Sequence, residues 1–392
     1  MTTRSPNRRL TRYSGLAAVA VFIALLTAAT AGPASADRAG QASRSGTVAA
    51  PPAELADIQP PAWLGHCATT HTPVVLPNGS PAQLVGQMCT PRGPRPTTVQ
   101  VTVHGATYDS DYWNWPQQPT AYNYVWHALA AGYAVYDVDR LGAGESTRPP
   151  STEVNETSTV STLHQVVTQL RAGRISGTPY RYVEGVGHSF GSYYLTAEAA
   201  ADPHDYDALV LTGAGHESSS AIAGIPKVPA SGVLPWASGL DNGYTTTDTL
   251  ANRIKLLYYA PDASPAVMRY DNSQARDTAS NSEFSTRPAD LTSLSLRITV
   301  PVLLLDGDHD VHYALCADGT TTCTTGQSFY DAEHSHFGTS CLAAAVVPAG
   351  HDVQLSTSAP EADRLMLSWS RQALGPHARG PVSCPATGAY HG

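Results

Sequence analysis

A serine flanked by glycines stands near the middle of the chain, in the order Gly187-His188-Ser189-Phe190-Gly191. A serine hydroxyl becomes a useful nucleophile only when it is held exposed beside a base. Glycines on both sides allow a tight strand-to-helix turn, from which the hydroxyl projects above a sheet. An apolar, β-branched run precedes the motif and a helical stretch follows it, which is the context that such a turn requires. The pattern predicts a nucleophile for acyl transfer, with an ordinary turn serine as the alternative.

The base for this serine is expected late in the chain, on a loop after the last strand. His351 follows the apolar run 343–347 and precedes a helical stretch, so we predict that it takes the serine proton. Four other late histidines compete with it: His309, His312, His334 and His336. They are less suitable because they lie in a polar, cysteine-bearing loop or, for His309, beside the expected acid.

Three aspartates follow the apolar run 301–305, and one of them is expected to orient the imidazole and stabilise its charge. We predict Asp310 for this role. Asp306, nearest the strand end, is an alternative, whereas Asp308 is expected to hold the turn, because Asp beside Gly favours turns. Glu217 follows the preceding strand and is the other alternative, because an acid there can also reach the histidine.

Acyl transfer also needs N–H donors for the oxyanion, and losing one typically raises the barrier by about 3 kcal/mol. The backbone N–H of Phe190 is one expected donor. The second is expected from the loop after the first core strand, where we favour Ala106, with Thr107 close behind and His104 in a packing role. Four aromatic residues follow, which either line an apolar pocket or form a surface patch: Tyr108, Tyr112, Trp113 and Trp115.

Short apolar runs alternate with helical stretches through most of the chain. The expected strands are residues 98–103, 134–138, 180–186, 208–212, 300–305 and 343–347, and the expected helices are 156–172, 192–201 and 361–374. A hairpin with the turn Asn78-Gly79 is expected before them. Because this alternation is typical of parallel sheets covered on both faces, the predicted fold class is α/β with a mostly parallel central sheet.

Residues 218–296 interrupt the alternation, with one clear helical run at 250–259. We therefore expect one domain, with its core at 65–217 and 297–392 and a cap or lid insertion at 218–296. Such a lid would lie over the carboxyl ends of the strands and exclude water. The Ala-, Pro-, Ser- and Gly-rich residues 37–64 are expected to form a flexible leader.

The N-terminus has the features of an export signal. Four arginines precede an apolar run at residues 15–31, and small residues follow it up to Ala36. This predicts a signal peptide at residues 1–36 and a secreted, extracellular protein. A membrane anchor is the alternative, although the run is short for a span. The Arg8-Arg9 pair leaves the export route open between the general and the twin-arginine systems.

The charge argues against several kinds of partner. The chain has 23 basic and 32 acidic residues, a net charge of −9, and losing the signal peptide removes four arginines and no acid, which gives −13. No basic patch is present to attract nucleic acid or an anionic membrane, so neither is an expected partner.

Six cysteines follow the expected cleavage point: Cys67, Cys89, Cys316, Cys323, Cys341 and Cys384. An even number in an oxidising compartment predicts three disulfides, for which fifteen pairings exist. Proximity along the chain favours Cys67–Cys89, Cys316–Cys323 and Cys341–Cys384. Zinc binding is the alternative, but paired C-x-x-C units are absent from the sequence.

Several motifs occur in the order typical of the α/β-hydrolase superfamily: Val103-His104-Gly105, the 139–146 stretch, the 187–191 motif, Gly307-x-x-Asp310 and Gly350-His351. Over residues 65–375 the chain resembles that superfamily, and most closely its secreted bacterial serine esterase and lipase branch. The resemblance implies a Ser189–His351–Asp310 triad with Phe190 and Ala106 in the oxyanion hole. It departs from some lipases in lacking the His-Gly-Gly-Gly loop, and the loop before His351 is longer than usual.

Three functions are compatible with these motifs. The leading one is hydrolysis of a carboxylic ester, thioester or lactone through an acyl-enzyme, with a small-molecule or lipid-like ester as substrate. An exported aminopeptidase similar to proline iminopeptidases would need cap acids for the substrate ammonium, and Asp241, Asp248 and Glu283 are the candidates. An inactive hydrolase fold that serves as a binding protein is the third. No cofactor or metal is expected, and no stable membrane anchor.

Overall fold

The computed structural model describes residues 58–217, 219–220, 226–288, 291–313, 316 and 323–392. The predicted signal peptide and residues 37–57 of the predicted leader lie outside these ranges. Of the rest of that leader, Leu64 donates its N–H to the carbonyl of Pro61 and is buried in the core. Across the described residues, no helix combines the length and the apolar character needed to cross a membrane.

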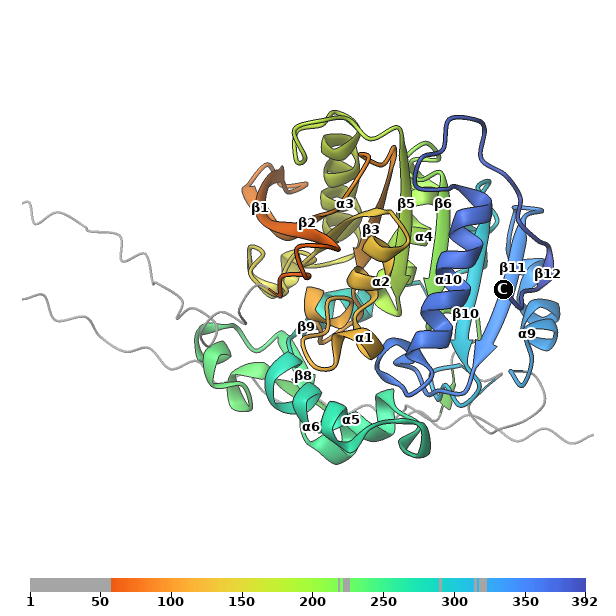
Figure 1. Ribbon diagram of the computed structural model, residues 1–392. Coiled ribbons are helices and arrows are strands. Elements are labelled where there is room, and N and C mark those ends of the chain that lie inside the picture. Colours follow the sequence, from red (N-terminus) through yellow and green to blue (C-terminus); the bar gives the residue numbers. More distant parts are fainter. Residues whose placement is uncertain (1–57, 218, 221–225, 289–290, 314–315, 317–322) are drawn as a thin grey trace, which may run out of the picture. The chain divides into compact units, whose positions relative to one another are not determined.

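A central sheet contains nine strands of the described chain, in the order β1-β2-β4-β3-β5-β6-β10-β11-β12 (Figure 1). Their bounds are β1 Gly65–Val75, β2 Pro81–Pro91, β3 Thr98–Val103, β4 Ala134–Val138, β5 Tyr182–His188, β6 Ala208–Thr212, β10 Val302–Gly307, β11 Leu342–Val347 and β12 Gly388–Ala389. The hairpin strands β1 and β2 pair antiparallel, as do β2 and β4, and every other pairing is parallel. The predicted α/β class with a mostly parallel sheet is therefore confirmed.

Helices cover both faces of this sheet. The helices on one face are α2 Tyr124–Ala130 and α10 Ala359–Ala373, and those on the other are α3 Glu156–Arg171, α4 Phe190–Ala201 and α9 Gly326–Glu333. Successive residues of a strand point to opposite faces, so Leu303 packs in the cluster of α10 and Leu304 in the cluster of α9. The buried strands thus carry apolar side chains on both sides, which is why they read as continuous apolar runs.

The strand before Ser189 differs from the expected range. It starts at Tyr182, not at residue 180, and continues to His188, where His188 still pairs with Thr212 of β6. Helix α4 starts at Phe190, two residues earlier than expected. Ser189 therefore links the strand and the helix directly.

We call the described part of residues 218–296 the insert. It holds a separate antiparallel sheet of β7 Lys227–Pro229, β8 Tyr244–Thr247 and β9 Ala279–Ser280, and the helices α5 Leu250–Leu257, α6 Pro265–Tyr270, α7 Asn281–Thr286 and α8 Thr292–Ser295. In Figure 1 its elements β8, α5 and α6 lie beyond the carboxyl ends of the central strands. The expectation of one helical run was wrong, because these short helices start at capping residues such as Thr249, Ser264 and Ser280 and lack a long apolar period.

Three disulfides join the pairs that proximity favoured, Cys67–Cys89, Cys316–Cys323 and Cys341–Cys384. The first links directly opposed residues of β1 and β2. The third ties the segment after α10 to the start of β11. All six cysteines are used in this way, so the zinc alternative was wrong.

Candidate active site

Ser189 occupies a strained turn between β5 and α4. Its φ is +52° and its ψ −116°, a region that residues with a Cβ rarely adopt. A Cβ on Gly191 would lie 2.0 Å from the carbonyl oxygen of Val103, and one on Gly187 would lie 2.6 Å from the Ser192 nitrogen. Close packing of the turn against β3 and α4 therefore requires both glycines of the motif.

His351 and Asp310 are brought together by adjacent parallel strands. Asp310 follows β10 and His351 follows β11, so both lie at the carboxyl edge of the sheet. The Nδ1 of His351 is 2.7 Å from the Oδ2 of Asp310, and both side chains are buried. Burial alone would lower the pKa of His351, but the Asp310 charge and hydrogen bond outweigh it and raise that pKa above 6.5. Burial likewise opposes ionisation of Asp310, yet His351 holds its pKa below the usual range.

The two alternative acids do not make this contact. Glu217 is exposed. Asp306 is buried, and burial together with the charge of Asp310 raises its pKa well above the usual range. Asp308 accepts a hydrogen bond from the Ala349 N–H and so ties the turn after β10 to the loop after β11. Of the acids considered from the sequence, Asp310 is thus the one that is hydrogen-bonded to His351.

His351 lines a cavity of about 220 Å³. Within the described residues, His351 Nε2 is buried without a hydrogen-bond partner, and both His351 and Ser189 line the cavity. Phe190 and Ala106 also line it, and no hydrogen bond within the described chain uses their backbone N–H groups. A Cβ on Gly105 would lie 3.2 Å from Ser189 Cβ, so the loop of Ala106 lies directly beside the serine.

Arg140 braces the loop that carries Ala106. Its Nε donates to the carbonyl of His104 and its Nη2 to that of Gly105, each at 3.1 Å. The Arg140 backbone N–H donates to His104 Nε2, so His104 has the packing and hydrogen-bonding role expected of it. The guanidinium also pairs with Glu283 of the insert. The insert therefore contributes to the support of this loop.

A second brace comes from the insert itself. Arg253, which is fully buried in α5, donates from Nη1 to the hydroxyl of Thr107 at 3.0 Å. Its other nitrogens bind both carboxylate oxygens of Asp271, at 2.7 and 2.6 Å. Thr107 has φ +62°, and its carbonyl accepts from the backbone N–H of Asp277. Two buried ion pairs thus hold the loop from either side of Ala106.

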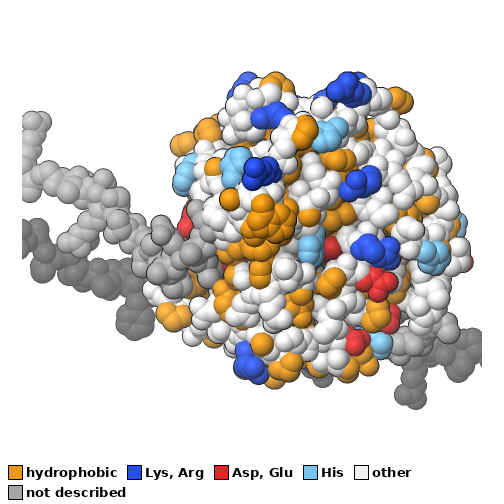
Figure 2. Space-filling view, in the orientation of Figure 1, with side chains coloured by type: hydrophobic (Ala, Val, Ile, Leu, Met, Phe, Trp, Pro, Cys, Tyr) orange, Lys and Arg blue, Asp and Glu red, His pale blue; other side chains and the backbone are white. Residues whose placement is uncertain are grey.

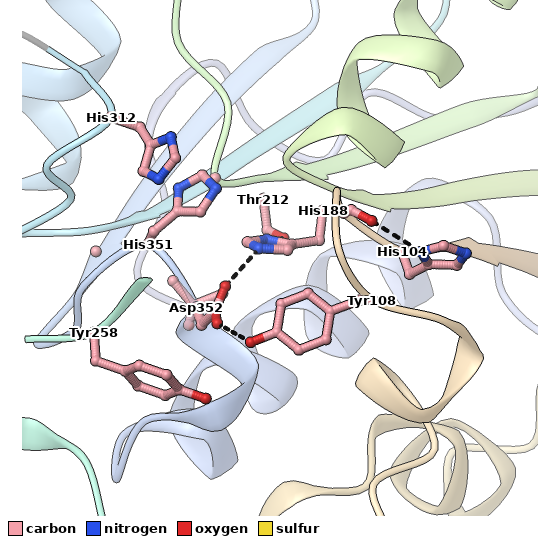
Figure 3. A network of polar contacts seen from close by, with 12 residues as sticks. His104, Tyr108, His188, Thr212, Tyr258, His312, His351 and Asp352 are labelled. Carbon is pink, nitrogen blue, oxygen red and sulfur yellow. Dashed lines mark hydrogen bonds and ion pairs between the residues drawn. The ribbon is translucent and has the colours of Figure 1, made fainter. Parts of the chain in front are cut away.

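A second polar network, which the sequence reading missed, adjoins His351 (Figure 3). Asp352 accepts a hydrogen bond from the hydroxyl of Tyr108 and lies 3.0 Å from His188 Nε2. Burial raises the pKa of Asp352 to about 6 and lowers that of His188 well below 6.5. His312 stacks on His351 at 3.7 Å between ring centroids, and burial lowers its pKa to about 3. His188 and Asp352 are chain neighbours of Ser189 and His351, but their contact with each other depends on the fold.

The four aromatic residues that follow the loop of Ala106 are buried, so the surface-patch interpretation was wrong. Of the four, Tyr108 lines the cavity. Tyr112 stacks on His188 at 4.3 Å, and Trp113 and Trp115 pack in the core beneath.

A further histidine–carboxylate pair lies in the wall of the same cavity. His216 Nδ1 pairs with Glu333, and His216 Nε2 is 2.9 Å from the hydroxyl of Ser295. This resembles a Ser-His-acid arrangement, but Ser295 ends the short helix α8. The N–H groups of Ser295 and Leu296 already donate to helix carbonyls, so they cannot stabilise an oxyanion.

Some of these groups place possible metal ligands together. His188, His351 and Asp352 have ligand atoms within 4.8 Å of one another, as do Asp310, His312 and His351. In both groups a histidine nitrogen is already hydrogen-bonded to a carboxylate oxygen. A cation would have to replace these bonds, so the donor set fits a hydrogen-bonded site better than a metal centre.

Comparison with known proteins agrees with this fold. Residues 100–388 match the model of the alpha/beta hydrolase family. The chain belongs to the α/β-hydrolase family. A comparison with curated proteins finds no match.

Solved structures show the same fold. The chain is similar to an esterase from Thermogutta terrifontis, with a TM-score of 0.55 and 16% identity, over 77% of this chain and 98% of that one. An esterase from Exiguobacterium antarcticum gives 0.51 and 16%, over 77% and 100%. A bromoperoxidase from Bacillus anthracis gives 0.53 and 17%, over 76% and 99%. At such identities the similarity concerns the fold and not the reaction.

Proposed function

We propose that the protein is a serine hydrolase that cleaves a carboxylic ester, thioester or lactone through an acyl-enzyme. The observation that carries this proposal is the state of His351. Its Nδ1 is hydrogen-bonded to a buried carboxylate, its Nε2 has no hydrogen-bond partner in the described chain, and His351 lines the same cavity as Ser189. This is what a general base for Ser189 requires.

The chemistry follows from these positions. Ser189 Oγ attacks the carbonyl carbon of the ester as its proton moves to His351 Nε2, and the carbonyl oxygen becomes an oxyanion. The N–H groups of Phe190 and Ala106 stabilise that charge. The intermediate collapses when the bond to the alcohol oxygen breaks, and His351 gives its proton to that oxygen. Water then attacks the acyl-enzyme by the same route, which releases the acid and restores Ser189.

The insert supports the proposal as a lid. Four of its side chains that line the cavity beside Ser189 are Lys227, Thr247, Phe284 and Arg287. A covered cavity excludes bulk water from the ester and strengthens each electrostatic contact within it. The insert also braces the oxyanion loop through Glu283 and Arg253, which links closure of the cavity to the geometry of the donors.

The aminopeptidase alternative has less support. None of the three acids suggested for binding a substrate ammonium lines the cavity. Asp241 accepts a hydrogen bond from the Ser151 N–H, Asp248 is half-buried and accepts one from Asn252, and Glu283 pairs with Arg140. Release of p-nitroaniline from aminoacyl anilides, without ester turnover, would favour it over the esterase.

We also propose that the protein is exported after cleavage near Ala36. Three disulfides support this, because such bonds persist in oxidising compartments. N-terminal sequencing of protein recovered from the culture medium should begin at Asp37. Retention of residues 1–36 in a membrane fraction would contradict this proposal.

The catalytic proposal is tested with Ser189→Ala and p-nitrophenyl butyrate. We expect kcat/KM to fall by at least about 10³-fold and labelling by a fluorophosphonate probe to disappear. Ser285→Ala is the matched control, since Ser285 is exposed on α7 outside the cavity wall. Unchanged turnover in Ser189→Ala would overturn the proposal.

A second variant, Ser295→Ala, should keep its fluorophosphonate labelling, and loss of labelling there would instead assign the nucleophile to Ser295. Wild-type protein that is neither labelled nor active would support the inactive binding fold.

A further inference from the structure

Two cationic side chains of the insert line the cavity that holds Ser189, namely Lys227 and Arg287. Lys227 starts β7 and Arg287 follows α7, so they come from separate elements. The esterase proposal uses them only as part of the lid and assigns no role to their charge. Both line the cavity, and neither forms an ion pair with a described residue, so both are available to bind a substrate.

An aromatic wall connects the nucleophile to Lys227. Phe190 directly follows Ser189, and its ring centroid is 4.9 Å from that of Phe284. The Nζ of Lys227 lies 3.6 Å from the centroid of Phe284. All four residues line the cavity. A substrate chain that extends from Ser189 along these rings therefore ends beside an ammonium group.

Arg287 is connected to Phe190 through a second aromatic residue, Tyr193. Its Cζ is 5.4 Å from the ring centroid of Tyr193, which in turn is 6.4 Å from that of Phe190. Each cation is thus connected to the residue after the nucleophile, Phe190, through one further aromatic ring. This order places an apolar section next to the reacting bond and positive charge at the far end.

Neither cation has a carboxylate partner within the described part of the chain. The Nε of Arg287 is buried with no hydrogen-bond acceptor there. Contact with a ring face attracts the charge but leaves the N–H donors unused. Two acids that line the cavity are occupied, since Glu333 is held by His216, and Asp352 by Tyr108 and His188. Among the described residues that line the cavity, no free carboxylate is therefore left for these donors.

We propose that Lys227 and Arg287 bind a carboxylate of the substrate, while an apolar segment between that carboxylate and the ester packs on Phe190 and Phe284. The guanidinium offers N–H donors in the geometry of a carboxylate, and the ammonium adds a point charge. The substrate class is a half-ester of a dicarboxylic acid or an acylated hydroxy acid. This proposal rests on the proposed esterase function.

The test compares esters that differ in one terminal group. Mono-p-nitrophenyl adipate is paired with p-nitrophenyl hexanoate, which places the carboxylate or a methyl group at the end of the acyl chain. Acetylated δ-hydroxyvalerate is paired with pentyl acetate, so that the alcohol part of the ester ends in a carboxylate in the first and in a methyl group in the second. For each pair, the ratio of the anionic to the neutral kcat/KM reports on the subsite, while turnover of the neutral ester reports on the esterase function.

The variants are Lys227→Met, Arg287→Met and the double variant. Lys255→Met and Arg269→Met are matched controls, because both are exposed cations of the insert that do not line the cavity. In one of the two pairs, the wild-type enzyme should have a higher kcat/KM for the anionic ester than for the neutral ester. Each single variant should lower that ratio by about 10-fold, and the double variant by about 100-fold, as expected for charge-assisted hydrogen bonds. The controls should keep the wild-type ratio, and thermal unfolding checks that every variant is folded.

The outcomes separate the two proposals. A wild-type enzyme that hydrolyses the neutral esters through Ser189 but disfavours both anionic ones would overturn the subsite and leave the esterase function intact. An equal loss on both members of a pair in the double variant would also overturn it, since that indicates a structural role. Failure to hydrolyse any of the four esters would contradict the proposed function itself, and the subsite with it.

Discussion

The buried guanidinium of Arg253 donates to the hydroxyl of Thr107 at 3.0 Å, across 146 residues of chain. Arg253 belongs to the insert, and Thr107 belongs to the core loop that carries the proposed oxyanion donor Ala106. The same guanidinium packs 4.4 Å from the ring centroid of Tyr108. Burial would lower the pKa of Arg253, but Asp271 outweighs this effect and raises it, so the brace stays charged. The loop that carries Ala106, a proposed oxyanion donor, is therefore tied to the insert through Arg253.

Replacing Arg253 should lower both the stability of the protein and its kcat, and a second substitution should restore the stability alone. Arg253→Met leaves Asp271 buried without its partner, which should lower the free energy of unfolding by about 3–5 kcal/mol. The loosened loop should lower kcat on the order of 100-fold with little change in KM, since small displacements of catalytic groups are costly. Adding Asp271→Asn should restore much of the stability, measured in denaturant, but not kcat. Recovery of both together would contradict a positioning role.

The pH profile of kcat/KM should report on His351. The base must be neutral to accept the serine proton, and its pKa is raised above 6.5. Activity should therefore be present above that raised pKa and be lost as the pH falls through it. Asp310→Asn removes the charge that raises the pKa and favours the wrong ring tautomer, so activity should fall on the order of 10⁴-fold. The acidic limb of the residual activity should move to lower pH. An unshifted limb would indicate that another group controls it.

Asp352 should have a smaller effect on the same limb. Its charge also raises the pKa of His351, but less than Asp310 does. Asp352→Asn can still accept the hydrogen bond from Tyr108, so the fold should be retained. We expect the acidic limb to shift downwards by less than in Asp310→Asn, with circular dichroism as the check on folding. A shift larger than that of Asp310→Asn would reverse the assigned roles.

The disulfides should differ in their contribution to stability. Cys341 and Cys384 are separated by 43 residues, whereas Cys316 and Cys323 are separated by seven. Removing the long-range bond with a double Ala substitution should cost about 2–4 kcal/mol, because it releases more entropy in the unfolded chain. The matched Cys316→Ala/Cys323→Ala protein should lose less. Denaturant unfolding measures both, and the reverse order would show that the entropy of loop closure does not dominate.

The core and much of the candidate site were predictable because they follow local patterns. The strands β3, β4 and β6 appear as apolar runs with the expected bounds. Because parallel strands end at one edge of a sheet, the positions of Asp310 and His351 after their strands already predicted their proximity. The disulfide pairing also followed from proximity along the chain.

The remaining features depend on contacts that have no local pattern. Arg253 and Asp271 read as ordinary charges on short segments, and only the folded insert brings them to Thr107. The pairing of His188 with Asp352 spans 164 residues, and that of His216 with Glu333 spans 117. Such buried polar pairs form only when the folded chain brings residues together that lie far apart in the sequence. For this reason the second network and the braces of the oxyanion loop were missed.

The short strand β12 has a consequence beyond the active site. It covers part of the outer edge of β11, an apolar strand of the sequence Leu-Ala-Ala-Ala-Val-Val, and Cys341–Cys384 joins its segment to the start of that strand. An uncovered edge of this kind presents free backbone groups that a second molecule can extend. Reduction of this disulfide would thus expose a template for intermolecular strand pairing and aggregation.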